Sequence, residues 1–324
     1  MGDAASATVL LNLQPNAAQF LADVVAGLRS SPKSLPCKYF YDERGSQLFD
    51  DICGLDEYYL TRTEDAIIRR HAQEMADQIG PGVMLVEYGS GSSTKTRALL
   101  DHLAAPVAYV PVDISREHLR HTAAQLSRAY PHIEMLPVCA DFTKPFHLPK
   151  SRRPPTHSAV FFPGSTIGNF QPDDARAMLV YLAAMCGRGG GLLIGIDLQK
   201  STRTIEAAYN DARGVTAEFN RNLLQRINGE LDADFDLDQF RHRAAYDRQI
   251  GRIEMSLVSL QPQRVTIGGH EFDFGAEEPI VTEYSHKYTI DGFAEMAADA
   301  GLTLRRKWTD AGEQFAVLHF ALLL

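Results

Sequence analysis

Between residues 83 and 200 the chain alternates short, nearly continuous apolar runs with segments in which apolar residues recur at helical spacing. Strands that are buried on both faces of a parallel sheet show such runs, and the crossover helices between them carry one apolar face. The runs that we interpret as strands are VMLV, AYVPVD, IEMLPVCADF, SAVFF and GLLIGIDL. The pattern therefore predicts an α/β fold with a doubly wound sheet.

This alternation stops after residue 200. Two helical patterns, residues 201–214 and 215–231, are followed by RIEMSLVSLQPQRVTI and a Gly-Gly turn, which together favour a hairpin. Near the end, IDGFAEMAADAGL predicts a helix, and LRRKWTD and FAVLHFALLL predict an antiparallel pair of strands. The first 60 residues are too polar and too rich in turns to belong to the sheet.

These patterns predict two parts of the chain. Residues 61–199 and 286–324 are expected to form the sheet domain, which binds a cofactor. Residues 1–60 and 200–285 are expected to form a second, smaller α+β lobe, which binds the substrate.

Composition narrows the functional classes. The 324 residues are 45% hydrophobic and 23% charged, as is usual for a soluble globular protein. The net charge of −9 argues against nucleic acid as a partner, because phosphates attract a basic surface. No apolar run is long enough to span a bilayer, and the segment MGDAASATVLLNLQP lacks the basic start of a secretion signal, so we expect a cytoplasmic protein. The four cysteines form no C-x-x-C pair, and we expect no metal site.

The most informative segment is EYGSGSSTK, which follows the first apolar run. Gly89 and Gly91 allow a sharp turn and a close approach of the backbone to a ligand. Ser92, Ser93 and Thr94 are suitable caps for the helix that follows. The loop matches neither G-x-G-x-x-G nor a phosphate-binding loop with G-K-[ST], so tight pyrophosphate binding is not expected.

Acidic residues end the next two strands. Asp113 can accept hydrogen bonds from both hydroxyls of a ribose, and Asp141 with Phe142 suits an adenine, which has an amino group and a face for stacking. Each acid alone could equally be a solvated residue at a strand end. A glycine loop, a ribose acid and an adenine acid in consecutive βα units resemble a class I S-adenosylmethionine-dependent methyltransferase.

Several segments outside this corner resemble one family. KSLPCKYFYDERGSQLFDDICGLDEYYLTRTE, PGSTIGNF, AAYNDARGVTAEFNRNLL and TEYSHKY are similar to the histidine Nα-methyltransferases of ergothioneine biosynthesis. The resemblance covers nearly the whole chain from Pro32 onward, and TEYSHKY with RIEMSL is the part that points to histidine. It implies trimethylation of the α-amine of L-histidine to hercynine, with S-adenosylmethionine as cofactor and no protein partner. The mono- and dimethyl intermediates would be substrates as well.

The resemblance implies that Asn169, Tyr209 and Gly164 hold the amino-acid backbone of the substrate. The chemistry agrees, because an amide can both donate to a carboxylate and accept from an amine, and a phenol can donate. Asn169 could instead be a simple turn residue, and Tyr209 an amphipathic helix residue packed in the core.

Glu283 and Ser285 lie two apart on a strand-like segment and so face the same side. Together they could satisfy both nitrogens of an imidazole. The resemblance adds Tyr58 as a contact to the imidazole and Met255 as part of the pocket wall. The alternative for Glu283 is a surface acid that pairs with Lys287.

The resemblance places Tyr41 near the reacting nitrogen and Lys95 near the cofactor, where it could reach the methionine carboxylate. Tyr41 could orient the amine lone pair, although an unperturbed phenol is a poor base at neutral pH. Lys95 could equally be an exposed helix lysine. Two other functions remain open: methylation of a different amino acid, or a non-catalytic binding protein with a methyltransferase fold.

Overall fold

The computed structural model describes residues 10–91 and 94–322 of the chain, so the predicted caps Ser92 and Ser93 lie outside the described residues. Its centre is a nine-stranded sheet with the order β1-β6-β4-β3-β7-β8-β15-β14, in which β5 also pairs with β4. The strands up to β8 run parallel, and β15 is antiparallel to both β8 and β14. The bounds are β1 Leu11–Leu13, β3 Val83–Tyr88, β4 Ala108–Asp113, β5 Glu134–Met135, β6 Val138–Ala140, β7 His157–Phe162, β8 Gly191–Asp197, β14 Leu302–Thr309 and β15 Phe315–Leu322.

Helices cover both faces of this sheet, which confirms the doubly wound prediction. Alternate side chains of β3 enter different cores: Leu85 packs on the side of Leu99, and Val86 packs on the side of Leu179. All six residues of β3 are buried, as its apolar run predicts. The helices are α3 Tyr59–Ile79, α4 Thr94–Leu100, α5 Arg116–Ala129, α6 Pro172–Cys186 and α9 Ile290–Ala298.

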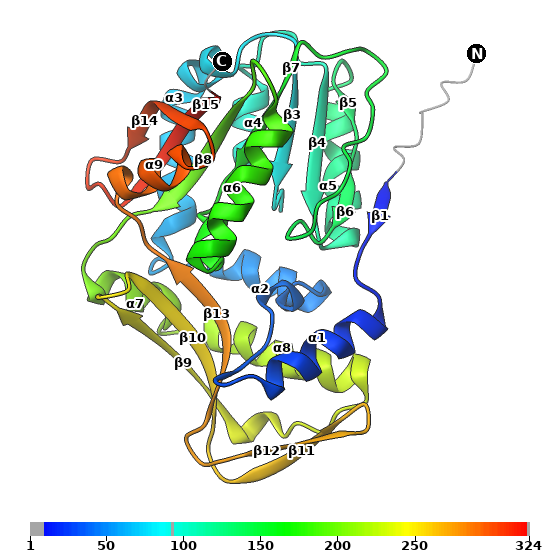
Figure 1. The fold of residues 1–324 in the computed structure, drawn as a ribbon, viewed down its shortest axis with the longest axis vertical. Helices are drawn as coiled ribbons and strands as arrows, with labels where there is room; N and C mark the ends of the chain where they lie inside the picture. The colour runs from blue at the N-terminus through cyan, green and yellow to red at the C-terminus, as the bar shows by residue number, and fades with distance from the viewer. Residues whose placement is uncertain (1–9, 92–93, 323–324) are drawn as a thin grey trace.

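A second sheet lies beyond the carboxyl ends of the parallel strands, in the lower half of Figure 1. Its order is β2-β13-β10-β9, and a separate hairpin joins β11 to β12. Its strands are β2 Lys33–Ser34, β9 Phe240–Asp247, β10 Arg252–Ser259, β11 Gln263–Ile267, β12 His270–Phe274 and β13 Pro279–His286. The helices around it are α1 Ala17–Arg29, η1 Cys37–Phe40, α2 Glu43–Cys53, α7 Thr202–Tyr209, α8 Val215–Leu231 and η3 Leu237–Gln239. Within the described ranges, no helix has the length and apolar character needed to cross a membrane.

Three features differ from the prediction. The N-terminal segment was expected to stay outside the large sheet, but Leu11–Leu13 forms its edge strand beside β6. The third predicted strand is broken into β5 and β6 around Pro137, whose ring nitrogen carries no N–H for a ladder bond. The Gly-Gly turn does close a hairpin, between β11 and β12, whereas β10 pairs with β13 and with β9, a strand that was not predicted. The division into two lobes stays a prediction.

Candidate active site

Three predicted cofactor residues meet at the carboxyl edge of the large sheet. Gly89 begins the loop after β3 with φ of +69°, a conformation that favours glycine, and its amide donates to the carbonyl of Val112 at 2.9 Å. Asp113 lies opposite Cys139 in the parallel register of β4 and β6, which places Asp141 at the same edge. The edge therefore brings the glycine loop and both acids together, as the order of strands predicts.

Asp113 organises this corner. Its Oδ2 accepts the amide of Gly91 at 3.0 Å, and its Oδ1 accepts the amide of Ser115 at 2.9 Å. Burial raises the pKa of the Asp113 carboxyl, and the amide hydrogen bonds partly offset that effect. Each oxygen keeps a further lone pair, so the carboxylate can still accept two hydroxyl groups of a ribose.

Asp141 has a partner that sequence reasoning missed. Its Oδ2 accepts from Nζ of Lys38 at 2.9 Å, while its Oδ1 accepts the amide of Thr143 at 3.1 Å. Burial opposes ionisation, yet the bonds from Thr143 and Lys38 outweigh it and lower the pKa of Asp141. Lys38 also lies 2.8 Å from Asp23, so it has a second carboxylate to hold if an adenine amino group takes its place on Asp141. The signal for Lys38 in the sequence is its position in KSLPCKYFYDERG, one of the segments that resemble the histidine methyltransferase family.

Phe142 is held by core aromatic side chains. Its ring lies edge-on to Tyr88 at 5.5 Å and to Phe162 at 5.9 Å between ring centroids. Tyr88, the last residue before the glycine loop, is buried and donates to the sulfur of Met185 at 3.1 Å. Tyr88 thus packs edge-on against Phe142 and holds its ring in place. The half-buried Phe142 ring is available for an adenine.

Glu64 of α3 joins the cofactor corner to the turn after β7. Both of its oxygens lie 2.9 Å from the amide nitrogen of Gly164, and the same carboxylate binds the ammonium of Lys95. A Cβ on Gly195 of β8 would collide with this carboxylate, so glycine is needed beneath it. The N–H of Gly164 is therefore occupied, and a backbone contact from Gly164 to a substrate must come from its carbonyl oxygen.

Aromatic side chains form a wall between η1, α2, α3, α7 and α8. Tyr41 lies 5.6 Å from Phe49 and 5.9 Å from Phe219, and Tyr58 lies 6.3 Å from Phe49 and 6.2 Å from Tyr209. Burial, followed by the charge of Glu283, raises the pKa of the Tyr41 phenol well above its ordinary value. The phenol stays protonated in the neutral range, so Tyr41 can orient or contact a ligand without acting as a phenolate base.

Glu283 faces this aromatic wall from β13. Its strand partner is Met255 of β10, which is 2% exposed, and a bulge follows Met255. Burial raises the pKa of the Glu283 carboxyl to about 7, and the charge of Lys287 partly opposes this. Burial raises the pKa values of Tyr58 and Tyr209, and the charge of Glu283 adds to this effect. The strand register and the ring contacts bring Glu283, Met255, Tyr58 and Tyr209 to the same part of the molecule, and their role in binding a substrate stays a prediction.

Lys287 does not form the surface ion pair with Glu283 that was the alternative. Its buried ammonium lies 2.9 Å from Oδ2 of Asp197, 2.9 Å from the Tyr209 hydroxyl and 3.0 Å from Oγ of Ser285. The Tyr209 hydroxyl also donates to Ser285 at 3.0 Å. Asp197 binds a second lysine, Lys200, at 2.6 Å, so this trio carries one formal positive charge. Such a charge favours a carboxylate beside Tyr209.

Asn169 ends the 3₁₀ helix η2, Thr166–Asn169, which packs on the end of β13. A Cβ on Gly168 would lie 2.7 Å from the carbonyl oxygen of His286, so this close approach requires glycine. Among the described residues, the half-buried side chain of Asn169 has no hydrogen-bond partner. Its amide is therefore free to donate to or accept from a ligand.

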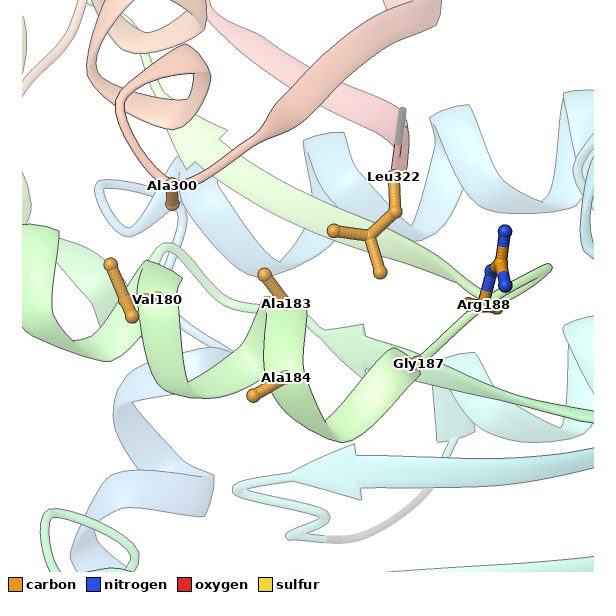
Figure 2. A pocket seen from close by; sticks show the side chains of 7 residues that line it. All are labelled: Val180, Ala183, Ala184, Gly187, Arg188, Ala300 and Leu322. Carbon is orange, nitrogen blue, oxygen red and sulfur yellow. The ribbon is translucent and has the colours of Figure 1, made fainter. Parts of the chain in front are cut away.

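A depression elsewhere on the surface holds none of these residues. It has a volume of about 350 Å³ and is lined by Val180, Ala183, Ala184, Gly187, Arg188, Ala300 and Leu322 (Figure 2). It lies near the C-terminal end of α6, which leads into the amino end of β8. The residues described above lie at the opposite, carboxyl edge of the sheet.

Comparison with known proteins shows which family the chain is similar to. A family model described as histidine-specific, S-adenosylmethionine-dependent methyltransferase matches residues 20–322. The histidine N-alpha-methyltransferases of Mycobacterium tuberculosis and Mycolicibacterium smegmatis are each 43% identical over 300 residues, which cover 91% of this chain and 92% of theirs. Ergothioneine biosynthesis protein 1 of Neurospora crassa is 32% identical over 297 residues, covering 88% of this chain and 33% of that protein.

Proposed function

Because the chain belongs to the family of histidine-specific, S-adenosylmethionine-dependent methyltransferases, we propose that it methylates the α-amino group of L-histidine. The observation that carries the choice of histidine is Glu283, a carboxylate whose pKa burial raises to about 7, on the same strand as Ser285. An apolar ring would leave the Glu283 carboxylate and the hydroxyl hydrogen of Ser285 without partners, whereas an imidazole can bond to both. The product would be hercynine, which is used in ergothioneine biosynthesis.

The cofactor residues fit S-adenosylmethionine. Asp113 would accept the ribose hydroxyls, and Asp141 with Phe142 would hold the adenine amino group and ring. Gly89 would leave space for the methionine part beside the loop, and Lys95, which follows the loop and is paired with Glu64, would contribute positive charge. When bound, the sulfonium supplies an activated methyl group, so the protein's task is alignment of the amine.

The substrate residues divide between the two ends of histidine. The Asn169 amide and the Gly164 carbonyl would hold the α-amine. Because Ser285 takes the hydroxyl hydrogen of Tyr209, the carboxylate would lie beside Tyr209 and be attracted by the positive charge of Lys287. Tyr58 and Met255 would line the imidazole pocket beside Glu283. An α-amine is mostly protonated near pH 7, so a proton must leave before each transfer.

Tyr41 would act next to the reacting nitrogen. Its protonated hydroxyl can accept a hydrogen bond from the amine and orient the lone pair toward the methyl group. Its ring, with those of Phe49 and Phe219, would face the quaternary ammonium that forms on the third transfer. Cation–π attraction would then favour the trimethylated product over the intermediates.

The test is direct. Purified protein is incubated with S-adenosylmethionine and a panel of free amino acids, and the products are read by mass spectrometry. We expect histidine to gain three methyl groups on its α-nitrogen with the imidazole unmodified. Turnover of tyrosine or tryptophan with none of histidine would favour a different amino acid as substrate, and binding of the cofactor without any turnover would favour a non-catalytic role. Methylation on a ring nitrogen would also overturn the proposal.

A further inference from the structure

Lys287 uses every hydrogen of its ammonium inside the protein. The three acceptors are Oδ2 of Asp197 at 2.9 Å, the hydroxyl of Tyr209 at 2.9 Å and Oγ of Ser285 at 3.0 Å. An ammonium has three N–H groups, so none remains for a ligand. With its side chain 0% exposed, Lys287 can act on a substrate only through the residues that it holds.

Lys287 limits the hydrogen bonds that Ser285 can form with a ligand. Its oxygen accepts from Lys287 and from the Tyr209 hydroxyl, which lies 3.0 Å away. A hydroxyl oxygen has two acceptor positions, and both are thereby filled. In the part of the chain that the structure describes, no acceptor receives the hydrogen of Ser285, although the residue is only 3% exposed. Ser285 can therefore only donate, and a ligand must bring the acceptor.

We propose that Lys287 is a positioning residue that sets side-chain specificity by fixing Ser285 as a hydrogen-bond donor. Glu283, two residues before it on β13, supplies the opposite element, an acceptor. The pocket then demands a ring with one N–H and one unprotonated nitrogen, which is a neutral imidazole. This inference rests on histidine as the substrate. It adds that a ring with an N–H but no unprotonated nitrogen binds poorly, because it offers no acceptor to the Ser285 hydroxyl.

The first experiment compares L-histidine with pyrrolylalanine, in both ring-position isomers, as substrates of the wild type and of Lys287→Met. The variant should raise the KM for histidine roughly 10-fold while kcat stays within about 2-fold, because the contact is made before and during transfer alike. The ratio of kcat/KM for histidine over pyrrolylalanine should fall roughly 3- to 10-fold, the size of one neutral hydrogen bond.

The matched control is Lys200→Met. Lys200 binds the same Asp197 at 2.6 Å, and its other bonds go to the Tyr59 hydroxyl and the Leu198 carbonyl. Removing it should lower the melting temperature while the substrate ratio stays at the wild-type value. An equal fall of the ratio in both lysine variants would show a general structural effect and would overturn the proposal.

Ser285→Ala and the double variant Lys287→Met/Ser285→Ala complete a double-mutant cycle, which tests whether the two residues act together. If Lys287 acts through Ser285, the double variant should show no more than about a 2-fold further change in the ratio, because coupled residues are non-additive. Additive effects, or a wild-type ratio in Lys287→Met, would refute the inference. Should Lys287→Met fail to fold, Ser285→Ala alone decides, since an unchanged ratio would mean that no donor faces the ring. A wild type that leaves histidine unmethylated would instead refute the proposed function.

Discussion

Replacing Glu283 with glutamine should stabilise the protein and, at the same time, lower its affinity for histidine. Burial holds the pKa of the Glu283 carboxyl at about 7, against an ordinary value of 4.5. The raised pKa means that the folded state disfavours the charged carboxylate, so ionisation of Glu283 lowers the free energy of unfolding. This loss is absent below about pH 4.5, is complete above about pH 7.5, and amounts to about 3 kcal/mol. Glutamine keeps the shape of the side chain and carries no charge.

The assay is chemical denaturation of wild type and Glu283→Gln at pH 5 and at pH 8. The free energy of unfolding of the variant, relative to wild type, should rise by about 2–3 kcal/mol between these values. The pH dependence of all other groups cancels in that difference. Glu254→Gln is the matched control, since Glu254 is a half-buried acid on the neighbouring strand β10, 3.8 Å from Arg252, and should change stability by less than about 1 kcal/mol at both pH values.

The same variant tests binding. Exchanging a charged hydrogen bond for a neutral one should raise the KM for histidine roughly 5- to 20-fold at pH 8, with the affinity for S-adenosylhomocysteine unchanged. A stability difference that does not vary with pH would refute the burial of the Glu283 charge. Wild-type KM in the variant would remove Glu283 from the pocket, and histidine would lose its most specific contact.

Three further outcomes are expected. Asp113→Ala should raise the dissociation constant for S-adenosylhomocysteine roughly 10- to 100-fold in calorimetry, since charged bonds to the ribose are lost, and an unchanged constant would exclude Asp113 from the site. Tyr41→Phe should lower kcat and leave the shape of its pH profile between pH 6 and about pH 9 unaltered, because the phenol pKa lies far above that range; loss of a basic limb would show that a phenolate takes part. Glu64→Gln should destabilise the fold by about 3 kcal/mol, because it leaves the Lys95 ammonium unpaired, and adding Lys95→Met should restore part of that loss; no restoration would mean that the pair is not the cause.

The cofactor corner could be predicted from the sequence because parallel strands align their carboxyl ends. Once the apolar runs define β3, β4 and β6, Gly89, Asp113 and Asp141 must meet at one edge, whatever the details of packing. The confirmed helices α7, α8 and α9 likewise follow from local periodicity. The resemblance to the histidine family rests on contiguous motif segments, which are visible in the sequence without any knowledge of the fold.

Packing across elements decided the rest. Lys38 reaches Asp141 over 103 residues of chain, and Lys287 reaches Tyr209 over 78. Neither periodicity nor propensity reports which charge will be buried beside which, because that depends on where separate elements come to lie. The sequence alone thus determined the parallel strands from β3 to β8, the glycine loop and the acids, but not the edge strand β1. The tertiary structure decided that the Gly164 amide is taken by Glu64, that burial raises the pKa of Glu283, and that Lys287 is enclosed with Asp197. A buried charge takes whichever partner the fold brings within hydrogen-bond reach.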